Sequence, residues 1–249
     1  MNIYNQIASR KEQGLKQFAI LLDPDKSTDS QTEHVCRLAA ESRVDYIFVG
    51  GSLLTNGNLP DCIKKIKSVC SVPVVLFPGN NAQIDKHADA ILFLSLISGR
   101  NPDLLIGNHV NSAPIIREKK LEAIPTGYML IDSGRPTSAL YMSNTLPIPA
   151  DKPDIAACTA MAGEMLGLKM IFMDAGSGAG IPITEDMIKA VRKSVDLPLI
   201  VGGGIKTAEK AFLNCKAGAD MIVVGNIIEK NPSLIKEIAE AVKSVPVTH

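Results

Sequence analysis

The chain has 249 residues, of which 46% are hydrophobic and 21% are charged, with 26 basic and 26 acidic side chains. This length suits one α/β barrel, and the balanced charge without a basic stripe argues against a nucleic-acid partner. Residues 1–17 are polar, and no run of about 18 apolar residues occurs, so neither a signal peptide nor a transmembrane helix is predicted. The five scattered cysteines indicate reduced thiols and a cytoplasmic location.

Eight short apolar segments recur along the chain, separated by longer segments with the apolar spacing of helices. Their uninterrupted hydrophobicity is typical of parallel strands that are covered on both faces. The predicted strands are 17–22, 45–49, 73–77, 90–94, 123–131, 170–173, 197–201 and 220–224. The predicted helices include 31–42, 61–70, 184–195, 207–217 and 232–243. Thr184 and Thr207 are suited to begin the helices that follow them.

The alternation of eight strands with helices predicts a (β/α)₈ TIM barrel that occupies residues 1–249 as a single domain. A doubly wound open sheet is the structural alternative. Segment 78–89 is short and polar, which predicts a stunted third helix or a loop in its place. Segment 132–152 is long for a loop after the fifth strand, and it is expected at the C-terminal face, where barrel active sites lie.

The first two predicted strands end in oxygen-bearing side chains. Asp23-Pro24-Asp25-Lys26 closes the first strand, and Gly50-Gly51-Ser52 closes the second. Asp23 and Ser52 therefore place a carboxylate and a hydroxyl on neighbouring strand ends, which suits Mg²⁺ bound together with substrate phosphates. The same residues also suit the start of a helix, so these motifs alone leave both interpretations open.

Charged and aromatic residues also mark the ends of the fourth and fifth strands. Arg100 and Arg135 are placed either to meet a pyrophosphate or to lie in solvent. Tyr128 is expected in the core, and Asp132 either faces the mouth or begins the inserted loop. None of these positions is diagnostic by itself.

Three glycine-rich turns follow the sixth, seventh and eighth predicted strands, at 174–180 (DAGSGAG), 202–206 (GGGIK) and 225–226 (GN). Glycine permits positive φ and lets backbone N–H groups approach an anion, and Ser177 adds a hydroxyl donor. Barrels commonly bind phosphate between the turns after strands seven and eight. A plain flexible loop explains any single turn, but three in register predict a phosphate site.

Asp174 is the acidic residue nearest to these turns. It is placed either to hold or deprotonate a substrate hydroxyl or to anchor the glycine loop. The sequence leaves these two roles open.

Motifs at the strand ends together resemble the geranylgeranylglyceryl phosphate synthase family, which includes the bacterial heptaprenylglyceryl phosphate synthases. The resemblance covers essentially the full chain, in order, and is nearer to the larger, second group of that family. The motifs are DPDK at 23–26, GGS at 50–52, PTGYMLID at 125–132, DAGSGAG at 174–180, GGGIK at 202–206 and VVGN at 223–226.

The resemblance implies a Mg²⁺-dependent prenyltransferase that joins sn-glycerol 1-phosphate to a polyprenyl diphosphate, with geranylgeranyl diphosphate the expected donor. The product is an ether lipid precursor, and diphosphate leaves. Asp23 and Ser52 correspond to the metal ligands, and Asp174 to the catalytic residue. The residues that correspond to the glycerol 1-phosphate site are Phe172, Met173, Asp174, Ala175, Gly176, Ser177, Gly178, Gly203, Gly204, Gly225 and Asn226. A homo-oligomer, dimer or hexamer, and peripheral membrane contact through the lipid substrate are also implied.

The chain departs from the family pattern immediately before the first glycine turn. The family usually has Tyr-Leu-Glu there, whereas this chain has Phe172-Met173-Asp174, so a hydroxyl is absent and the acid is one methylene shorter. The sequence leaves two rival functions open. One is another phosphate-binding barrel enzyme, an isomerase or a lyase, and the other is a barrel that binds a phosphometabolite without turning it over.

Overall fold

The computed structural model describes residues 2–55 and 58–247 and contains a closed barrel of eight parallel strands. Each strand pairs with the next in the sequence, and β8 returns to β1, where Ala19 lies opposite both Tyr46 and Val223. The strands are β1 Gln17–Leu22, β2 Tyr46–Val49, β3 Val74–Leu76, β4 Ala90–Leu96, β5 Glu122–Leu130, β6 Met170–Asp174, β7 Leu199–Gly202 and β8 Met221–Val224. The barrel prediction is confirmed, and the open-sheet alternative is wrong because both edges of the sheet are joined.

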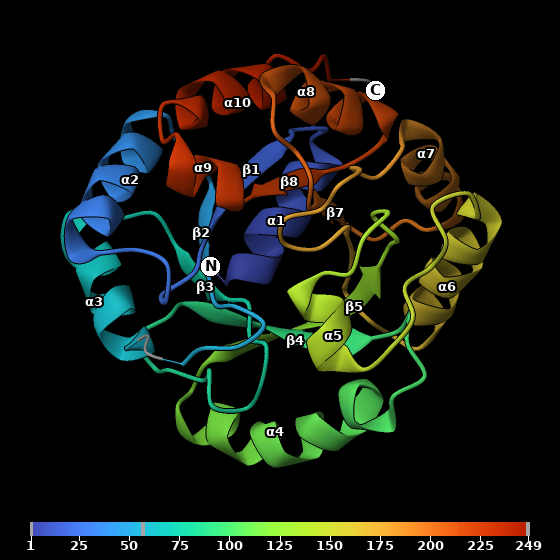
Figure 1. Ribbon diagram of the computed structural model, residues 1–249, viewed down its shortest axis with the longest axis horizontal. Helices are drawn as coiled ribbons and strands as arrows, with labels where there is room; N and C mark the ends of the chain where they lie inside the picture. Colours follow the sequence, from blue (N-terminus) through green and yellow to red (C-terminus); the bar gives the residue numbers. More distant parts are fainter. Residues whose placement is uncertain (1, 56–57, 248–249) are drawn as a thin grey trace.

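Helices α2, α3, α4, α6, α7, α8 and α10 surround the barrel as a ring (Figure 1). The helices of the described residues are α1 Ile3–Glu12, α2 Asp29–Glu41, α3 Leu59–Val69, the π-helix η1 Asp103–Gly107, α4 Asn108–Glu118, α5 Ser138–Ser143, α6 Pro153–Met165, α7 Glu185–Ser194, α8 Ala208–Ala217, α9 Asn226–Lys230 and α10 Leu234–Lys243. Thr184 and Thr207 cap α7 and α8 through their side-chain oxygens, as predicted. Within residues 2–55 and 58–247, no helix has the length and apolar character needed to cross a bilayer.

Both predicted departures from a minimal barrel are present. Residues 77–89, all of which the structure describes, form no helix between β3 and β4. The segment after β5, residues 132–152, is here called the insertion; it contains the short helix α5, and a bridge between Ile131 and Ile148 returns it to the barrel edge. In Figure 1, α5 lies in front of the barrel opening rather than in the outer ring.

Alternation along the strands divides the core into two layers, because successive side chains of a strand point to opposite faces. One layer fills the barrel interior and includes Ala19, Phe48, Leu92 and Phe172. The other lies between the strands and the helices. The strands are therefore buried on both sides, which explains their uninterrupted apolar sequences.

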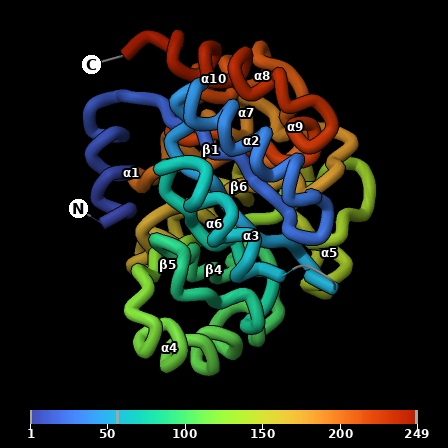
Figure 2. The backbone as a smooth tube through the Cα atoms, turned by 90° about the vertical axis from the view of Figure 1, so that its left-hand side faces the viewer, coloured from blue at the N-terminus to red at the C-terminus, as the bar shows by residue number. Residues whose placement is uncertain are grey.

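Helix α1 closes the N-terminal end of the barrel, and its buried Ile3 and Ile7 belong to the interior cluster. The Glu122 carboxylate, at the start of β5, accepts hydrogen bonds from the amides of Ile3 at 2.6 Å and Tyr4 at 2.9 Å. The free N–H groups of a helix start are thereby satisfied by a negative charge. Figure 2 shows α1 and α5 at opposite ends of the molecule. The open mouth is thus at the C-terminal ends of the strands.

Candidate functional site

A cavity of about 830 Å³ occupies the C-terminal mouth of the barrel. Its lining includes residues from the ends of all eight strands, from the 77–89 loop, from η1 and α4, and from the inserted segment with α5. Chain segments far apart in the sequence therefore converge on one space, as the barrel topology requires.

The turn after β6 takes its shape from glycines. Gly176 and Gly178 have φ angles of +85° and +73°, a region that side-chain-bearing residues rarely adopt. The inserted segment packs directly onto this turn. A Cβ atom placed on Gly176 would lie 2.7 Å from Thr137 Oγ1, and one on Gly178 would lie 3.1 Å from Arg135 Nη2. The insertion therefore covers the turn at close contact and brings a guanidinium to it.

The turn after β7 is equally dependent on glycine. Gly203 and Gly204 have φ angles of +78° and +70°. A Cβ atom on Gly203 would lie 2.6 Å from Asp174 Oδ1 and 2.7 Å from the amide nitrogens of Ala175 and Gly176. Because Gly203 has no side chain, the turns after β6 and β7 can pack directly against each other.

Asn226 joins the third turn to the first. Helix α9 begins at Asn226, directly after Gly225, and the Ser177 hydroxyl donates to Asn226 Oδ1 at 3.0 Å. The three turns thus form one continuous surface of backbone amides and small polar side chains, which suits an anion such as phosphate.

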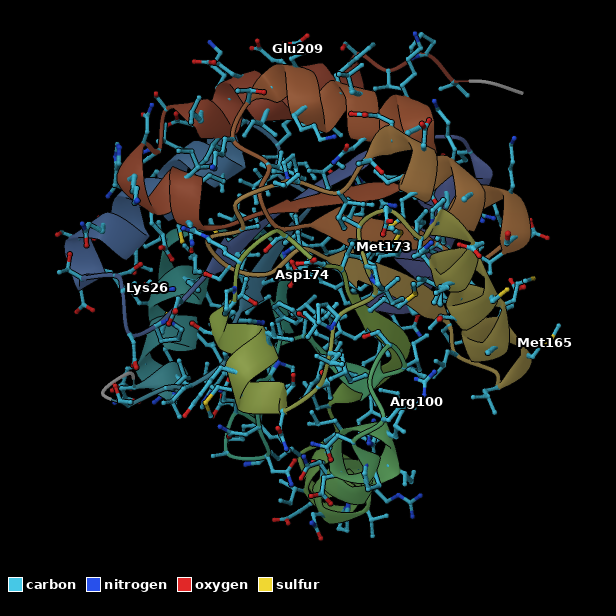
Figure 3. The ribbon with its side chains drawn as sticks, turned by 45° about the vertical axis from the view of Figure 1, so that its right-hand side comes forward. Lys26, Arg100, Met165, Met173, Asp174 and Glu209 are labelled. Atoms are coloured by element: carbon cyan, nitrogen blue, oxygen red, sulfur yellow. The ribbon has the colours of Figure 1, made fainter. Side chains whose placement is uncertain are left out.

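Asp174, at the end of β6, lies beneath this surface, and Figure 3 shows it near the centre of the mouth. Its side chain is buried with 8% of the residue exposed. Oδ1 accepts from the Gly176 amide at 2.8 Å, and Oδ2 accepts from the Tyr128 hydroxyl at 2.6 Å. Burial raises the pKa of Asp174, and the hydrogen bonds from Tyr128 and Gly176 oppose that rise.

Asp174 therefore does anchor the glycine turn, which was one of its two predicted roles. It also lines the cavity, so the second role, contact with a substrate hydroxyl, is compatible with its position.

Aromatic rings form the floor of the cavity. Phe77 and Phe172 stack with centroids 5.2 Å apart, and Tyr128 meets both edge-on at 5.6 Å. Tyr128 is in the core, as predicted, but its hydroxyl faces Asp174. Burial and the nearby Asp174 charge raise the pKa of Tyr128 well above its ordinary value, so this group donates the hydrogen bond.

The ends of β1 and β2, beside the turn after β8, carry the predicted metal ligands. Asp23 and Ser52 both line the cavity, and the Asp23 carboxylate oxygens lie 3.2 Å from the position that a Cβ atom on Gly51 would take. The Lys26 ammonium pairs with Asp23 Oδ2 at 2.7 Å. Glu229, a further cavity-lining carboxylate, comes from α9 and was missed by the sequence analysis because nothing in its local sequence distinguishes it from a solvated helix residue.

The cavity extends from the floor towards β4, η1 and α4, where its lining combines apolar side chains with polar ones such as Asn108, His109 and Ser112. The apolar cavity-lining residues from these elements are Ile91, Leu92, Phe93, Leu94, Leu96, Leu104 and Ile116. Three of the polar lining residues are hydrogen-bonded to one another: the Ser112 hydroxyl donates to Asn81 at 2.8 Å, and the Asn81 amide donates to Asn108 at 3.4 Å. These bonds join α4 to the 77–89 loop, which connects β3 to β4 without a helix.

The structure brings most of the predicted site residues together around the cavity. Met173 and Ala175 differ, because alternation along β6 turns their buried side chains outward into the layer beneath the helices. The two arginines separate: Arg135 lines the cavity, whereas Arg100 is exposed at the periphery, where it donates to the carbonyl of Gly99 at 2.7 Å (Figure 3).

Known proteins are similar to this chain in sequence and in fold over nearly its full length. A geranylgeranylglyceryl phosphate synthase from Chitinophaga pinensis is 59% identical over 240 residues, which cover 96% of this chain and 95% of that protein. One from Spirosoma linguale is 53% identical over 233 residues, covering 94% of each.

Among solved structures, (S)-3-O-geranylgeranylglyceryl phosphate synthase from Thermoplasma acidophilum, in complex with its substrate sn-glycerol-1-phosphate, superposes with a TM-score of 0.93. It is 30% identical, and the match covers 98% of this chain and 100% of that one. The model of the PcrB family matches residues 8–242. This chain therefore belongs to the PcrB family.

Proposed function

We propose that this protein transfers a geranylgeranyl group from its diphosphate to the 3-hydroxyl of sn-glycerol 1-phosphate and releases diphosphate. The observation that carries the proposal is the composition of the mouth: one cavity joins a glycine-built anion surface, an Asp23–Ser52 edge and an apolar extension. The two substrates together carry a phosphate, a diphosphate and one long hydrocarbon chain, which match these three parts in turn. The family relationship favours this transferase over an isomerase, a lyase or a non-catalytic binding barrel.

The glycine turns are the proposed seat of the acceptor. Backbone amides of the β6 and β7 turns and the side chains of Ser177 and Asn226 surround the phosphate, and the Arg135 guanidinium supplies a cation from the insertion. Held there, the acceptor presents its hydroxyl to Asp174, which accepts the proton as the new bond forms. Positioning and proton acceptance are thus separate tasks of neighbouring residues.

The Asp23 edge fits Mg²⁺ by the chemistry of its donors, a carboxylate and a hydroxyl oxygen. Within the described part of the chain, no group of three or more His, Cys, Asp or Glu side chains has metal-binding geometry. Asp23 and Ser52 would hold the ion together with substrate phosphate oxygens. When bound, Mg²⁺ neutralises the charge that grows on the departing diphosphate. Lys26, already paired with Asp23, places a second positive charge at the same edge.

The apolar extension is the proposed place of the prenyl tail. The β4 side chains and Leu104 offer hydrocarbon contacts, and burial of apolar surface contributes roughly 25 cal/mol per Å². The tail runs away from the glycine turns towards α4, so the diphosphate end remains at the Asp23 edge.

Exposed apolar side chains support self-association of this protein. Tyr141 and Leu146 in the insertion are 84% and 85% exposed, and a homo-oligomer, either a dimer or a hexamer, would cover them. All five cysteines are free, in keeping with a cytoplasmic location, and the lipid substrate would bring the mouth into peripheral contact with a membrane.

The decisive experiment incubates the protein with radiolabelled prenyl diphosphates from C15 to C35, with and without sn-glycerol 1-phosphate and Mg²⁺. We expect consumption only when both are present, with the highest kcat/KM for the C20 donor. Turnover without glycerol phosphate, or binding of glycerol phosphate with no diphosphate release, would contradict the proposal. A preference for C35 would retain the reaction and correct the donor.

A further inference from the structure

We propose that Tyr128 is the positioning residue of this site: its hydroxyl holds the Asp174 carboxylate in the orientation that receives the proton of the acceptor hydroxyl. The inference rests on the proposed function and assigns a role in it to a side chain from the neighbouring strand.

The geometry of the pair is direct. Tyr128 and Phe172 occupy paired positions on β5 and β6, and Asp174 follows two residues later on the same face of β6. The Tyr128 hydroxyl reaches Asp174 Oδ2 at 2.6 Å, and both residues are more than nine-tenths buried. Phe172, although closer to Asp174 along the chain, has no hydroxyl to offer.

The Tyr128 ring has little freedom to move. It meets Phe77 and Phe172 edge-on at 5.6 Å, with interplanar angles of 77° and 83°. Such aromatic contacts favour one ring orientation. The hydroxyl is consequently a fixed donor rather than one that follows the carboxylate.

Two hydrogen bonds hold Asp174. The Gly176 amide donates to Oδ1 at 2.8 Å, and the Tyr128 hydroxyl donates to Oδ2. The Gly203 backbone lies so near to Oδ1 that an added Cβ atom would be only 2.6 Å from it. Removal of the Tyr128 hydroxyl leaves Oδ2 without its donor and frees rotation about the Cβ–Cγ bond of a short side chain. The remaining lone pairs of Oδ2 are those available to a substrate hydroxyl in the cavity.

The step that this orientation serves is balanced in atoms and charge. The acceptor oxygen forms a bond to the allylic carbon, the bond from that carbon to the diphosphate oxygen breaks, and the diphosphate leaves with the electron pair. The hydroxyl proton passes to Asp174. Tyr128 keeps its own proton throughout, because the hydrogen bond that it donates is part of the holding geometry.

The test compares Tyr128→Phe with the parent under saturating substrates. We expect kcat to fall about ten- to a hundred-fold, as for the loss of a hydrogen bond to a charged group, while KM for sn-glycerol 1-phosphate changes less than about threefold. Tyr46→Phe is the matched control, since Tyr46 is also a buried interior tyrosine but lies at the other end of the barrel, near Glu122. We expect its kcat to equal that of the parent.

The pH dependence of kcat distinguishes this role from a simple loss of packing, which would not shift the pH profile. The Tyr128 hydrogen bond favours ionised Asp174, so its removal raises the pKa of Asp174 and moves the acid limb of kcat to higher pH. Tyr128 from β5 is the titratable group that contacts the carboxylate, while Arg135 from the insertion and Lys206 from the β7 turn line the same cavity. Neither cation is altered in the variant.

A double-mutant cycle decides whether Tyr128 acts through Asp174. If it does, Tyr128→Phe combined with Asp174→Asn is no slower than Asp174→Asn alone. Multiplied losses, or an unchanged kcat and pH profile in Tyr128→Phe, would overturn the proposal. Carbon-13 NMR titration of the Asp174 carboxyl group in parent and Tyr128→Phe tests the same contact without turnover. If the parent transfers no prenyl group, the proposed function is wrong, and the titration still shows whether Tyr128 controls the pKa of Asp174.

Discussion

Gly203→Ala tests whether the glycine turns build the acceptor site. Gly203 has a φ angle of +78°, and an added Cβ would meet Asp174 Oδ1 at 2.6 Å and two amide nitrogens at 2.7 Å. The left-handed backbone costs an alanine about 1–2 kcal/mol, and the contacts below 3.0 Å must be relieved by moving the β6 turn. Loss of one or two amide contacts to phosphate lowers affinity on the order of ten- to a hundred-fold.

Gly167→Ala is the matched control for this substitution. Gly167 has a similar φ angle of +85°, yet an added Cβ would meet no atom within 4 Å. Both variants therefore carry the backbone strain, and each is expected to lower the unfolding temperature by a few degrees. Only Gly203→Ala moves the turn.

Isothermal titration calorimetry with sn-glycerol 1-phosphate measures the difference. We expect the parent affinity in Gly167→Ala and a dissociation constant at least about tenfold higher in Gly203→Ala. Equal affinity of the two variants would refute the placement of the phosphate on these turns.

Three further substitutions probe separate parts of the molecule. Asp23→Asn is expected to abolish Mg²⁺-dependent turnover, whereas binding of glycerol 1-phosphate, measured by calorimetry, persists. Mg²⁺-dependent turnover in this variant would show that Asp23 is not a metal ligand. Arg135→Ala is expected to raise KM for glycerol 1-phosphate roughly fivefold, with Arg135→Lys intermediate, and steady-state kinetics that leave KM unchanged would remove Arg135 from the site. Glu122→Ala leaves two amides of α1 without their acceptor and is expected to lower the free energy of unfolding by about 1–3 kcal/mol without altering kcat. Thermal unfolding and turnover are measured on the same variant, and a lower kcat with unchanged stability would contradict this expectation.

The barrel was predictable because its signals are local and repeated. Predicted strand and helix bounds agree with the structure to within two residues, since continuous apolar runs and capping threonines mark their own ends. Helices α1, α4 and α6 escaped prediction for local reasons: α4 contains Pro114, and α6 is rich in alanine and has no narrow apolar stripe. The polar sequence of α1 hides a helix that is held mainly by its docking onto the barrel.

The site was predictable only as far as strand ends define it. The topology brings Asp23, Ser52 and the glycine turns to one mouth, and that convergence follows from the fold alone. The contact between Tyr128 and Asp174 depends on the register of β5 against β6, which no local pattern encodes. Likewise, the sequence could not separate Arg135 from Arg100, because the path of the insertion decides which of them reaches the cavity.

The close packing of Thr137 against Gly176 makes the insertion and the phosphate turn a single cooperative unit. Residues 132–152 reach their place only if position 176 lacks a side chain, and the β6 turn is covered only if the insertion is in place. An exchange of this segment between relatives would therefore succeed only as a cassette that carries the matching glycine turn with it. Evolutionary change at the rim and at the acceptor site is expected to be correlated for the same reason, although Thr137 and Gly176 are 39 positions apart in the sequence.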